Sequence, residues 1–352
     1  MRGRMTPNHQ LHRTVNSGAA LFSRRRFLTN ASALGAASFL GLPRTAAAEP
    51  PPETRKLTLV QIPNICQAPQ YIAEELLRSE GFTEVQYVQK QGGKGIESAL
   101  ASGEADINMH YAAPTLLRLD AGDPIVVLAG GHIGCFEIVG SERVRAIRDL
   151  KGKSVGIIEL GDSTHAYLAT IIAYMGLDPR KDIIWVPHPA PEGMKLLAEG
   201  KIDALMATPP FAQELRAKGI GHVLVNSTVD RPWSQYFCCM VSGNREFVRK
   251  HPVATKRALR AILKSADICS LEPGRAARFI VDKGYAKNYD YALEVMKDLP
   301  YGKWREYNPE DTLRFYALRL DEIGMIKSNA QKLIAQGSDW QFLKELKKEL
   351  KA

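Results

Sequence analysis

Apolar and polar positions along most of the chain follow two different spacings. Short apolar runs such as KLTLVQI (56–62) and PIVVLAG (124–130) have the length of buried strands. Between them, runs such as QYIAEELLRSEG (70–81) and HAYLATIIAYMG (165–176) repeat apolar residues three and four positions apart, which predicts helices. Alternating strands and helices predict an α/β fold in which mostly parallel sheets are flanked by helices.

This alternation continues as far as residue 242 and gives way to a mainly helical pattern from Asn244 onward. Further strands are expected at residues 84–90, 105–110, 154–160, 182–187, 203–207, 222–226 and 236–242. Further helices are expected at residues 95–103, 114–122, 193–200 and 210–219. A length of 352 residues favours two lobes over one compact core.

One sequence motif, L-A-x-G-x-x-D-x-x-M, occurs twice in the chain, 97 residues apart, and each copy predicts a helix, a turn and a strand. Its glycines, Gly103 and Gly200, suit the left-handed residue that ends a helix. Its acids, Asp106 and Asp203, are expected to tie the turn before the next strand through their side chains. The repeat predicts one such unit in each of two lobes, although the same motif is also common turn chemistry between a helix and a strand.

The formal charge of +9 comes mainly from the first 48 residues, which hold seven Arg and no Lys, Asp or Glu. The rest of the chain has a net charge of +2, so nucleic acid is not expected as a partner. The run SRRRFLT (23–29) matches the twin-arginine export pattern, and a short apolar run follows it. The expected signal residues are Arg24, Arg25, Phe27 and Leu28, with cleavage after Ala48. A basic disordered tail is the other interpretation.

We therefore expect residues 1–48 to be a twin-arginine signal peptide and residues 49–55 to be a linker. The apolar run at 28–42 is shorter than the roughly 20 residues that span a bilayer. The mature chain is expected to be a soluble protein of the periplasm, with the twin-arginine translocase as its partner during export.

The cysteines are odd in number, and their spacing matches no metal-ligand motif. They are Cys66, Cys135, Cys238, Cys239 and Cys269. Cys238 and Cys239 are adjacent, so their side chains would face opposite ways on a strand. Cys269 continues an apolar helical stripe, where a buried free thiol is expected. No disulfide framework, metal or cofactor is predicted.

Five segments follow one another in a specific order: IPNICQAPQYIAEELL, QGGKGIESALASGEADI, DLKGKSVGI, KLLAEGKIDALMATPPFAQEL and YFCCMVSGNREFVRKHPVATKRAL. In this order they resemble the substrate-binding proteins of ABC importers. The resemblance is to the nitrate, sulfonate and taurine group, which also includes binders of thiamine-pyrimidine precursors. It spans the chain from about Lys56 to the end.

This resemblance implies the two-lobed fold of type II periplasmic binding proteins, with crossing hinge strands at 135–141 and 236–242. It also implies a solute-binding protein without catalytic activity, whose partners are an ABC permease and its ATPase subunits. Lobe I would comprise residues 56–140 and 238–352, and lobe II residues 141–237.

In open α/β sheets, ligands bind beyond the carboxyl ends of the strands, so the corresponding loops are expected to face an interlobe cleft. The glycine loop at 91–95 either opens a helix whose free N–H groups favour an anion or is a plain flexible turn. The loop at 161–165 either caps the next helix or, as the resemblance implies, contacts the ligand. The expected ligand-binding residues are Asn64, Gln70, Tyr71, Gly92, Gly93, Tyr111, Ala112, His132, Asp162, Ser163, Thr164, Pro209, Phe211, Trp233 and Tyr236.

Aromatic residues in this set suit a flat or apolar part of a ligand, although core packing is their commoner role. The changes Trp233→Ala and Tyr236→Ala are therefore predicted to weaken ligand binding without unfolding the protein. Acidic residues at 159 and 162 would oppose a small inorganic anion, and the clear cations nearby are Lys94 and Arg231. A mixed-polarity organic solute fits this set better.

Two other functions stay open. One is an enzyme similar to the thiamine-pyrimidine synthases, which use Cys- and His-based chemistry. The match is only superficial: it consists of His110, Cys238 and Cys239, and the fuller cysteine cluster is absent. The sequence contains nothing that resembles a Ser/His/Asp triad or a paired-carboxylate site. The other is a sensor or scavenger protein, which the same fold would serve equally well.

Overall fold

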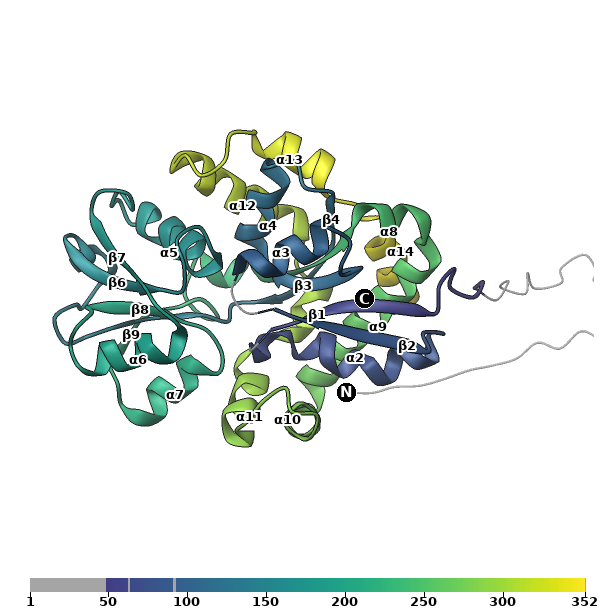
Figure 1. The fold of residues 1–352 in the computed structure, drawn as a ribbon, viewed down its shortest axis with the longest axis horizontal. Coiled ribbons are helices and arrows are strands. Elements are labelled where there is room, and N and C mark those ends of the chain that lie inside the picture. The colour runs from purple at the N-terminus through teal and green to yellow at the C-terminus, as the bar shows by residue number, and fades with distance from the viewer. Residues whose placement is uncertain (1–48, 63, 91–92, 352) are drawn as a thin grey trace, which may run out of the picture. The chain divides into compact units, whose positions relative to one another are not determined.

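The computed structural model describes residues 49–62, 64–90 and 93–351 (Figure 1). The expected signal peptide, with Arg24, Arg25, Phe27, Leu28 and Ala48, lies outside the described residues, as does Gly92. From Pro51 the chain forms one compact unit, in which strands and helices alternate as far as Asn244. The predicted α/β fold is therefore confirmed.

The described strands form three hydrogen-bonded sheets. One sheet contains β1 (Lys56–Gln61) and β2 (Glu84–Gln89). The second has the order β3 (Ile107–Tyr111), β10 (Phe237–Asn244), β4 (Ile125–Ile133). The third has the order β7 (Ile183–Pro187), β6 (Lys153–Ile157), β8 (Ala204–Ala207), β5 (Glu137–Gly140), β9 (His222–Asn226).

Two strands, β5 and β10, each enter a sheet away from their neighbour in the sequence. β5 follows β4 but lies between β8 and β9, and β10 follows β9 but lies between β3 and β4. Both run antiparallel to their neighbours, whereas the β1–β2, β6–β7 and β6–β8 pairs are parallel. An antiparallel strand needs no crossover helix, so these two strands give mixed sheets. The lobe boundaries stay a prediction.

Helices alternate with the strands and then form the C-terminal part of the chain. The first group is α2 (Ala68–Ser79), α3 (Gly93–Ala101), α4 (Ala112–Asp120), α5 (Ser163–Tyr174), α6 (Ala190–Ala198) and α7 (Phe211–Lys218). The second group is α8 (Arg245–Lys250), α9 (Pro252–Leu271), α10 (Pro273–Asp282), α11 (Tyr289–Asp298), α12 (Pro309–Glu322), α13 (Ala330–Gly337) and α14 (Gln341–Glu349). Short 3-10 helices are η1 (Ile65–Gln67), η2 (Ile147–Leu150), η3 (Trp233–Gln235) and η4 (Tyr301–Arg305).

The longest helix, α9, packs against α2 and buries Cys269 as a free thiol, as predicted. Within the described part of the chain, every helix is too short or too polar to cross a lipid bilayer.

The repeated acids Asp106 and Asp203 make equivalent contacts. Asp106 Oδ2 accepts from Thr58 N at 2.7 Å, and Asp203 Oδ2 accepts from Ser154 N at 2.9 Å. In return, the backbone N–H of each Asp donates to the carbonyl of the same partner at 2.8 Å. Each acid therefore joins its own strand to a neighbouring strand, instead of closing its own turn as the sequence suggests.

Candidate functional site

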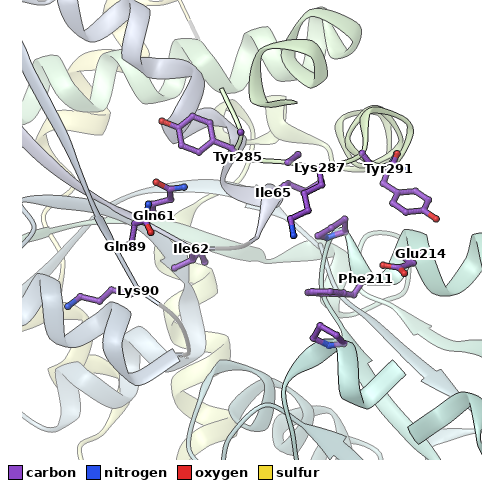
Figure 2. A pocket seen from close by; sticks show the side chains of 15 residues that line it. Gln61, Ile62, Ile65, Gln89, Lys90, Phe211, Glu214, Tyr285, Lys287 and Tyr291 are labelled. Carbon is purple, nitrogen blue, oxygen red and sulfur yellow. The ribbon is translucent and has the colours of Figure 1, made fainter. Parts of the chain in front are cut away.

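A cavity of about 520 Å³ opens at the carboxyl ends of β1, β2 and β8 (Figure 2). One wall comes from β1, β2 and η1, a second from α6 and α7, and a third from the segment between α10 and α11. The lining residues are Gln61, Ile62, Ile65, Gln89, Lys90, Pro191, Pro210, Phe211, Glu214, Gly284, Tyr285, Ala286, Lys287, Asn288 and Tyr291. This volume suits a small organic molecule.

The first wall follows directly from the pairing of β1 and β2. These strands are parallel, and their last residues, Gln61 and Gln89, stand opposite one another. Parallel strands end at the same edge of a sheet, so two amide side chains reach the cavity together. Ile62 and Ile65 continue this wall as apolar surface.

Tyr285 forms an aromatic part of the wall and is supported from behind by a second ring. Its ring stacks on that of Tyr71, with centroids 4.3 Å apart and planes at 8°. The Tyr71 hydroxyl donates to Ile62 O at 3.1 Å, which holds the stack against the end of β1. Burial, and then the negative charge of Glu74, raises the pKa of Tyr285, so this hydroxyl stays protonated at neutral pH.

The charged residues of the lining are Lys90, Glu214 and Lys287. Lys90 pairs with Glu104 at 2.8 Å, and Glu214 pairs with Lys218. Lys287 makes no ion pair with another described residue, and Figure 2 shows its side chain extending between the walls. Because α7 and α11 also begin at this cavity, their positive N-terminal ends add to the attraction for an anion.

Two predicted ligand residues, Asn64 and Gln70, already hold neighbouring segments together. Asn64 accepts from Cys66 N at 3.1 Å and donates to the Tyr111 hydroxyl. Gln70 hydrogen-bonds the backbones of residues 60 and 109, both at 2.7 Å, and so joins β1 to β3. Their role toward a ligand stays a prediction.

The loop before α5 serves as a helix cap. Asp162 accepts from His165 N at 2.9 Å and from Thr164 Oγ1 at 2.7 Å. Thr164 Oγ1 in turn accepts from Ile158 N at 3.0 Å, and Ser163 is buried as the first residue of α5. Of the two roles expected for this loop, the structure displays capping, and the ligand role stays a prediction.

The predicted aromatic residues are divided between the cavity and the interior. Phe211 lines the cavity as the first residue of α7. Trp233 is 3% exposed, with its ring 5.4 Å from that of Tyr174 and 5.7 Å from that of Phe315. Tyr236 is half-buried: its ring stacks on that of Phe315 with centroids 4.0 Å apart, and it lines a second hollow beside α12, separate from this cavity. Within the described lining, Phe211 is the one residue that the sequence predicts.

The other predicted residues are not among the described lining residues. Tyr71 supports Tyr285, Pro209 is buried next to the lining residue Pro210, and Ala112 is buried at the start of α4. Gly93 begins α3. His132 lies among cysteines, away from the cavity lining.

Sequence reasoning missed the third wall, with Tyr285, Lys287 and Tyr291. These residues belong to the segment GYAKNYDY (284–291), which comprises the link after α10 and the first turn of α11. Three tyrosines and a lysine within eight residues are the signal that could have identified it. The prediction for the Lys94 side chain lies outside what the structure describes. Arg231 is not part of the described lining, where Lys287 provides the unpaired cation.

Comparison with known proteins identifies a family for the chain and several relatives of known structure. Residues 50–281 match the NMT1-like family. The chain is 22% identical over 303 residues to the nitrate/nitrite binding protein NrtA of Nostoc sp., covering 78% of this chain and 68% of that protein.

Solved structures agree on the fold. The periplasmic nitrate-binding protein NrtA from Synechocystis PCC 6803 has a TM-score of 0.74 at 13% identity, covering 86% of this chain and 90% of that one. The alkanesulfonate-binding protein SsuA from Xanthomonas axonopodis pv. citri, bound to MOPS, has a TM-score of 0.68 at 16% identity, covering 84% and 100%. The desulfurization enzyme DSZB also matches, with a TM-score of 0.60 at 15% identity over 84% and 99%. This fold is the type II periplasmic binding fold, and fold alone does not decide between binding and catalysis.

Proposed function

The chain belongs to the NMT1-like family, and from this premise we propose that it is the solute-binding component of an ABC importer. It captures a small organic anion with an apolar or aromatic part and delivers it to a membrane permease that a separate ATPase energises. The observation that carries this proposal is that the walls of the cavity belong to two different sheets: one wall is the end of the β1–β2 sheet, and another is α7, the helix that follows β8 of the five-stranded sheet.

Different lining residues are expected to contact the different parts of the solute. Lys287 and the N-terminal ends of α7 and α11 attract the anionic group. Phe211, Tyr285 and the isoleucines of the first wall cover the apolar part. A solute that touches both sides favours the closed arrangement of the lobes, and a shift from mostly open to mostly closed needs about 5 kcal/mol of differential affinity.

The lining supports binding more than catalysis. Among its described residues there is no His, Cys, Ser, Thr or Asp. Glu214, Lys287 and the tyrosines of the lining can transfer a proton, but Glu214 pairs with Lys218, and the described lining has no Ser, Thr or Cys nucleophile beside these groups. In the proposed setting the protein reaches the periplasm through the twin-arginine translocase and works there as a soluble carrier.

The class of solute is tested by a thermal-shift screen with nitrate, alkyl and aryl sulfonates, aromatic carboxylates and neutral pyrimidines. A bound solute raises the melting temperature by mass action. We expect organic anions to give the largest shifts. A response to neutral pyrimidines alone would contradict the proposal.

Lys287→Gln is expected to weaken binding of the best organic anion about tenfold, because a hydrogen bond to a charged group contributes about 1.5–3 kcal/mol. Calorimetry measures the change. Lys283→Gln is the matched control, since Lys283 lies four residues away, pairs with Glu74 and is not in the lining. Equal affinity in both variants would remove Lys287 from the site.

A further inference from the structure

A second group of chemically active side chains lies away from the cavity lining, where the chain crosses between sheets. It consists of Cys66 in η1, His132 in β4, Cys135 between β4 and β5, and Cys239 in β10. Their potential ligand atoms all lie within 4.8 Å of one another, and no member is more than 4% exposed. The group cannot be recognised from the spacing of its residues in the sequence, because it forms only when distant strands pair. In that pairing Cys239 lies opposite His132.

One pair of these thiols has the separation of two ligands around a metal ion. Cys66 Sγ and Cys239 Sγ are 3.9 Å apart. In a tetrahedral site with metal–sulfur bonds of about 2.3 Å, neighbouring sulfur atoms lie about 3.8 Å apart.

His132 presents the correct nitrogen to these thiols. Its Nδ1 lies 2.9 Å from the carbonyl oxygen of Gly134. A carbonyl only accepts hydrogen bonds, so Nδ1 carries a proton, and in the neutral imidazole Nε2 then has the free lone pair. Nε2 is buried and has no hydrogen-bond partner among the described residues. Metal-bound histidines are typically oriented in this way, through a carbonyl on the other nitrogen.

We propose that Cys66, His132, Cys135 and Cys239 bind one thiophilic d10 metal ion, Zn²⁺ or Cu⁺. Three thiolates and one imidazole are a common donor set for tetrahedral zinc, and thiolates also select Cu⁺. The three thiols release their protons to solvent when the ion binds. Because the site is buried and all four positions are protein ligands, the ion is structural and leaves no position open for a substrate.

The position of the site indicates what the ion stabilises. Cys135 lies on the segment that leads from β4 into β5, whereas His132 and Cys239 lie on paired strands of the three-stranded sheet. The ion therefore ties the crossing segment and η1 to this sheet. None of the four ligands lines the cavity, so the inference does not depend on the proposed solute.

One competing arrangement involves the remaining thiol of this region. Cys238 Sγ lies 2.8 Å from Cys135 Sγ, so a bond between these two sulfurs would remove Cys135 as a ligand. The experiment must distinguish a metal site from such an oxidised pair.

The test uses the full-length chain, purified anaerobically with reductant and stripped by a chelator. Separate titrations with Co²⁺, Zn²⁺ and Cu⁺ are expected to show one bound ion per chain, with the intense visible absorption of tetrahedral thiolate-bound Co²⁺. X-ray absorption of the zinc form is expected to show three sulfur atoms and one nitrogen atom. Competition between Zn²⁺ and Cu⁺ then identifies the preferred ion.

Variants assign the ligands. Cys66→Ser is expected to lower the affinity for Co²⁺ at least tenfold, whereas Cys269→Ser, which removes an equally buried thiol outside the cluster, retains it. Stripping the metal is expected to lower the melting temperature of the unmodified chain by several degrees.

Three results would overturn the proposal: no binding of these ions by the reduced chain, an oxygen-rich coordination shell, or full affinity in folded Cys66→Ser. A metal-free native protein with a Cys135–Cys238 bond, found by mass spectrometry, would do the same. If Cys66→Ser does not fold, the X-ray absorption of the unmodified chain decides.

Discussion

At the scale of single residues, the aromatic side chains divide into those that stabilise the core and those that can touch a solute. Trp233 and Tyr236 follow β9 in a loop that looks suited to a ligand, but Phe315 of α12 packs on both rings. The sequence could not show this because α12 is distant along the chain and its packing partner is not encoded locally. Tyr285 and Tyr291 line the cavity instead.

Trp233→Ala is expected to lower the free energy of unfolding by about 3–5 kcal/mol, since it leaves a hole between Tyr174 and Phe315. Urea denaturation measures the loss. Tyr291→Ala, at the cavity, is expected to cost less stability and to weaken solute binding. If Trp233→Ala instead weakened solute binding and kept its stability, Trp233 would be a ligand residue and the packing interpretation would be wrong. The structure thus favours instability for Trp233→Ala, where the sequence predicts weaker binding without unfolding.

At the scale of elements, the repeated unit shows how closely local sequence can predict structure. Gly103 and Gly200 have φ angles of 78° and 68°, as the left-handed end of a helix requires. The predicted strands and helices up to residue 242 occur within a few residues of their expected places. Periodicity could not predict the partners of β5 and β10 or the packing of the C-terminal helices. Both depend on contacts between segments that are distant in the sequence.

The two repeated acids differ in one neighbour. Asp203 has an ion pair with Arg143, whose Nε lies 2.6 Å from its carboxylate. Burial raises the pKa of Asp203, but the hydrogen bonds from Ser154 and Arg143 outweigh this effect and leave it below the ordinary value. Burial raises the pKa of Asp106 above the ordinary value, because the hydrogen bond from Thr58 only partly opposes it.

Asp203→Asn is therefore expected to lose about 1–3 kcal/mol of stability at neutral pH. An acid with a lowered folded pKa contributes stability above its unfolded pKa of about 3.9, and this is lost as pH falls through the folded pKa. The deficit of Asp203→Asn relative to wild type should thus shrink in acid. Urea denaturation between about pH 3 and pH 8 measures it.

Asp106→Asn is expected to show the opposite trend. Ionised Asp106 opposes folding above its unfolded pKa, so the Asn variant should gain stability relative to wild type as pH rises. Asn still offers an oxygen to Thr58 N. If the stability of both variants relative to wild type changed with pH in the same direction, the ion pair with Arg143 would not be what separates the pKa values of the two acids.

At the scale of the whole molecule, Arg216 of α7 connects the two sides of the cavity. It contacts Glu137 of β5 and, across the cavity, Glu294 and Asp298 of α11, the latter at 2.7 Å. Glu137 is buried, whereas the two carboxylates of α11 are about two-fifths exposed. If the lobes open and close as proposed, these exposed pairs with α11 form when the two walls approach and break when they separate.

The double variant Glu294→Gln/Asp298→Asn is expected to shift the free protein toward open arrangements, about twofold to fivefold for each pair lost. Small-angle X-ray scattering at low salt should show a larger radius of gyration, and high salt should reduce the difference. Glu310→Gln is the control, because Glu310 is similarly exposed and pairs only within α12. An unchanged radius of gyration in the double variant would show that the ion pairs of Arg216 with α11 do not stabilise the closed arrangement.

The candidate site was only partly predictable from the sequence. The rule that ligands bind beyond the carboxyl ends of strands leads correctly to Phe211 and to the segment after β1. It could not lead to Lys287, which belongs to no βα repeat. It also could not bring Cys66, Cys135 and Cys239 together, because their proximity depends on the register of β10 against β4.

The central position of β10 also determines when the protein can fold during its synthesis. A ribosome releases β3 and β4 long before residue 244, yet these strands have no partner between them until β10 emerges. Until then their edges and apolar faces stay exposed, so this stage of synthesis is the one most prone to aggregation. If the twin-arginine translocase takes the chain in its folded state, translation through β10 must be complete before export begins.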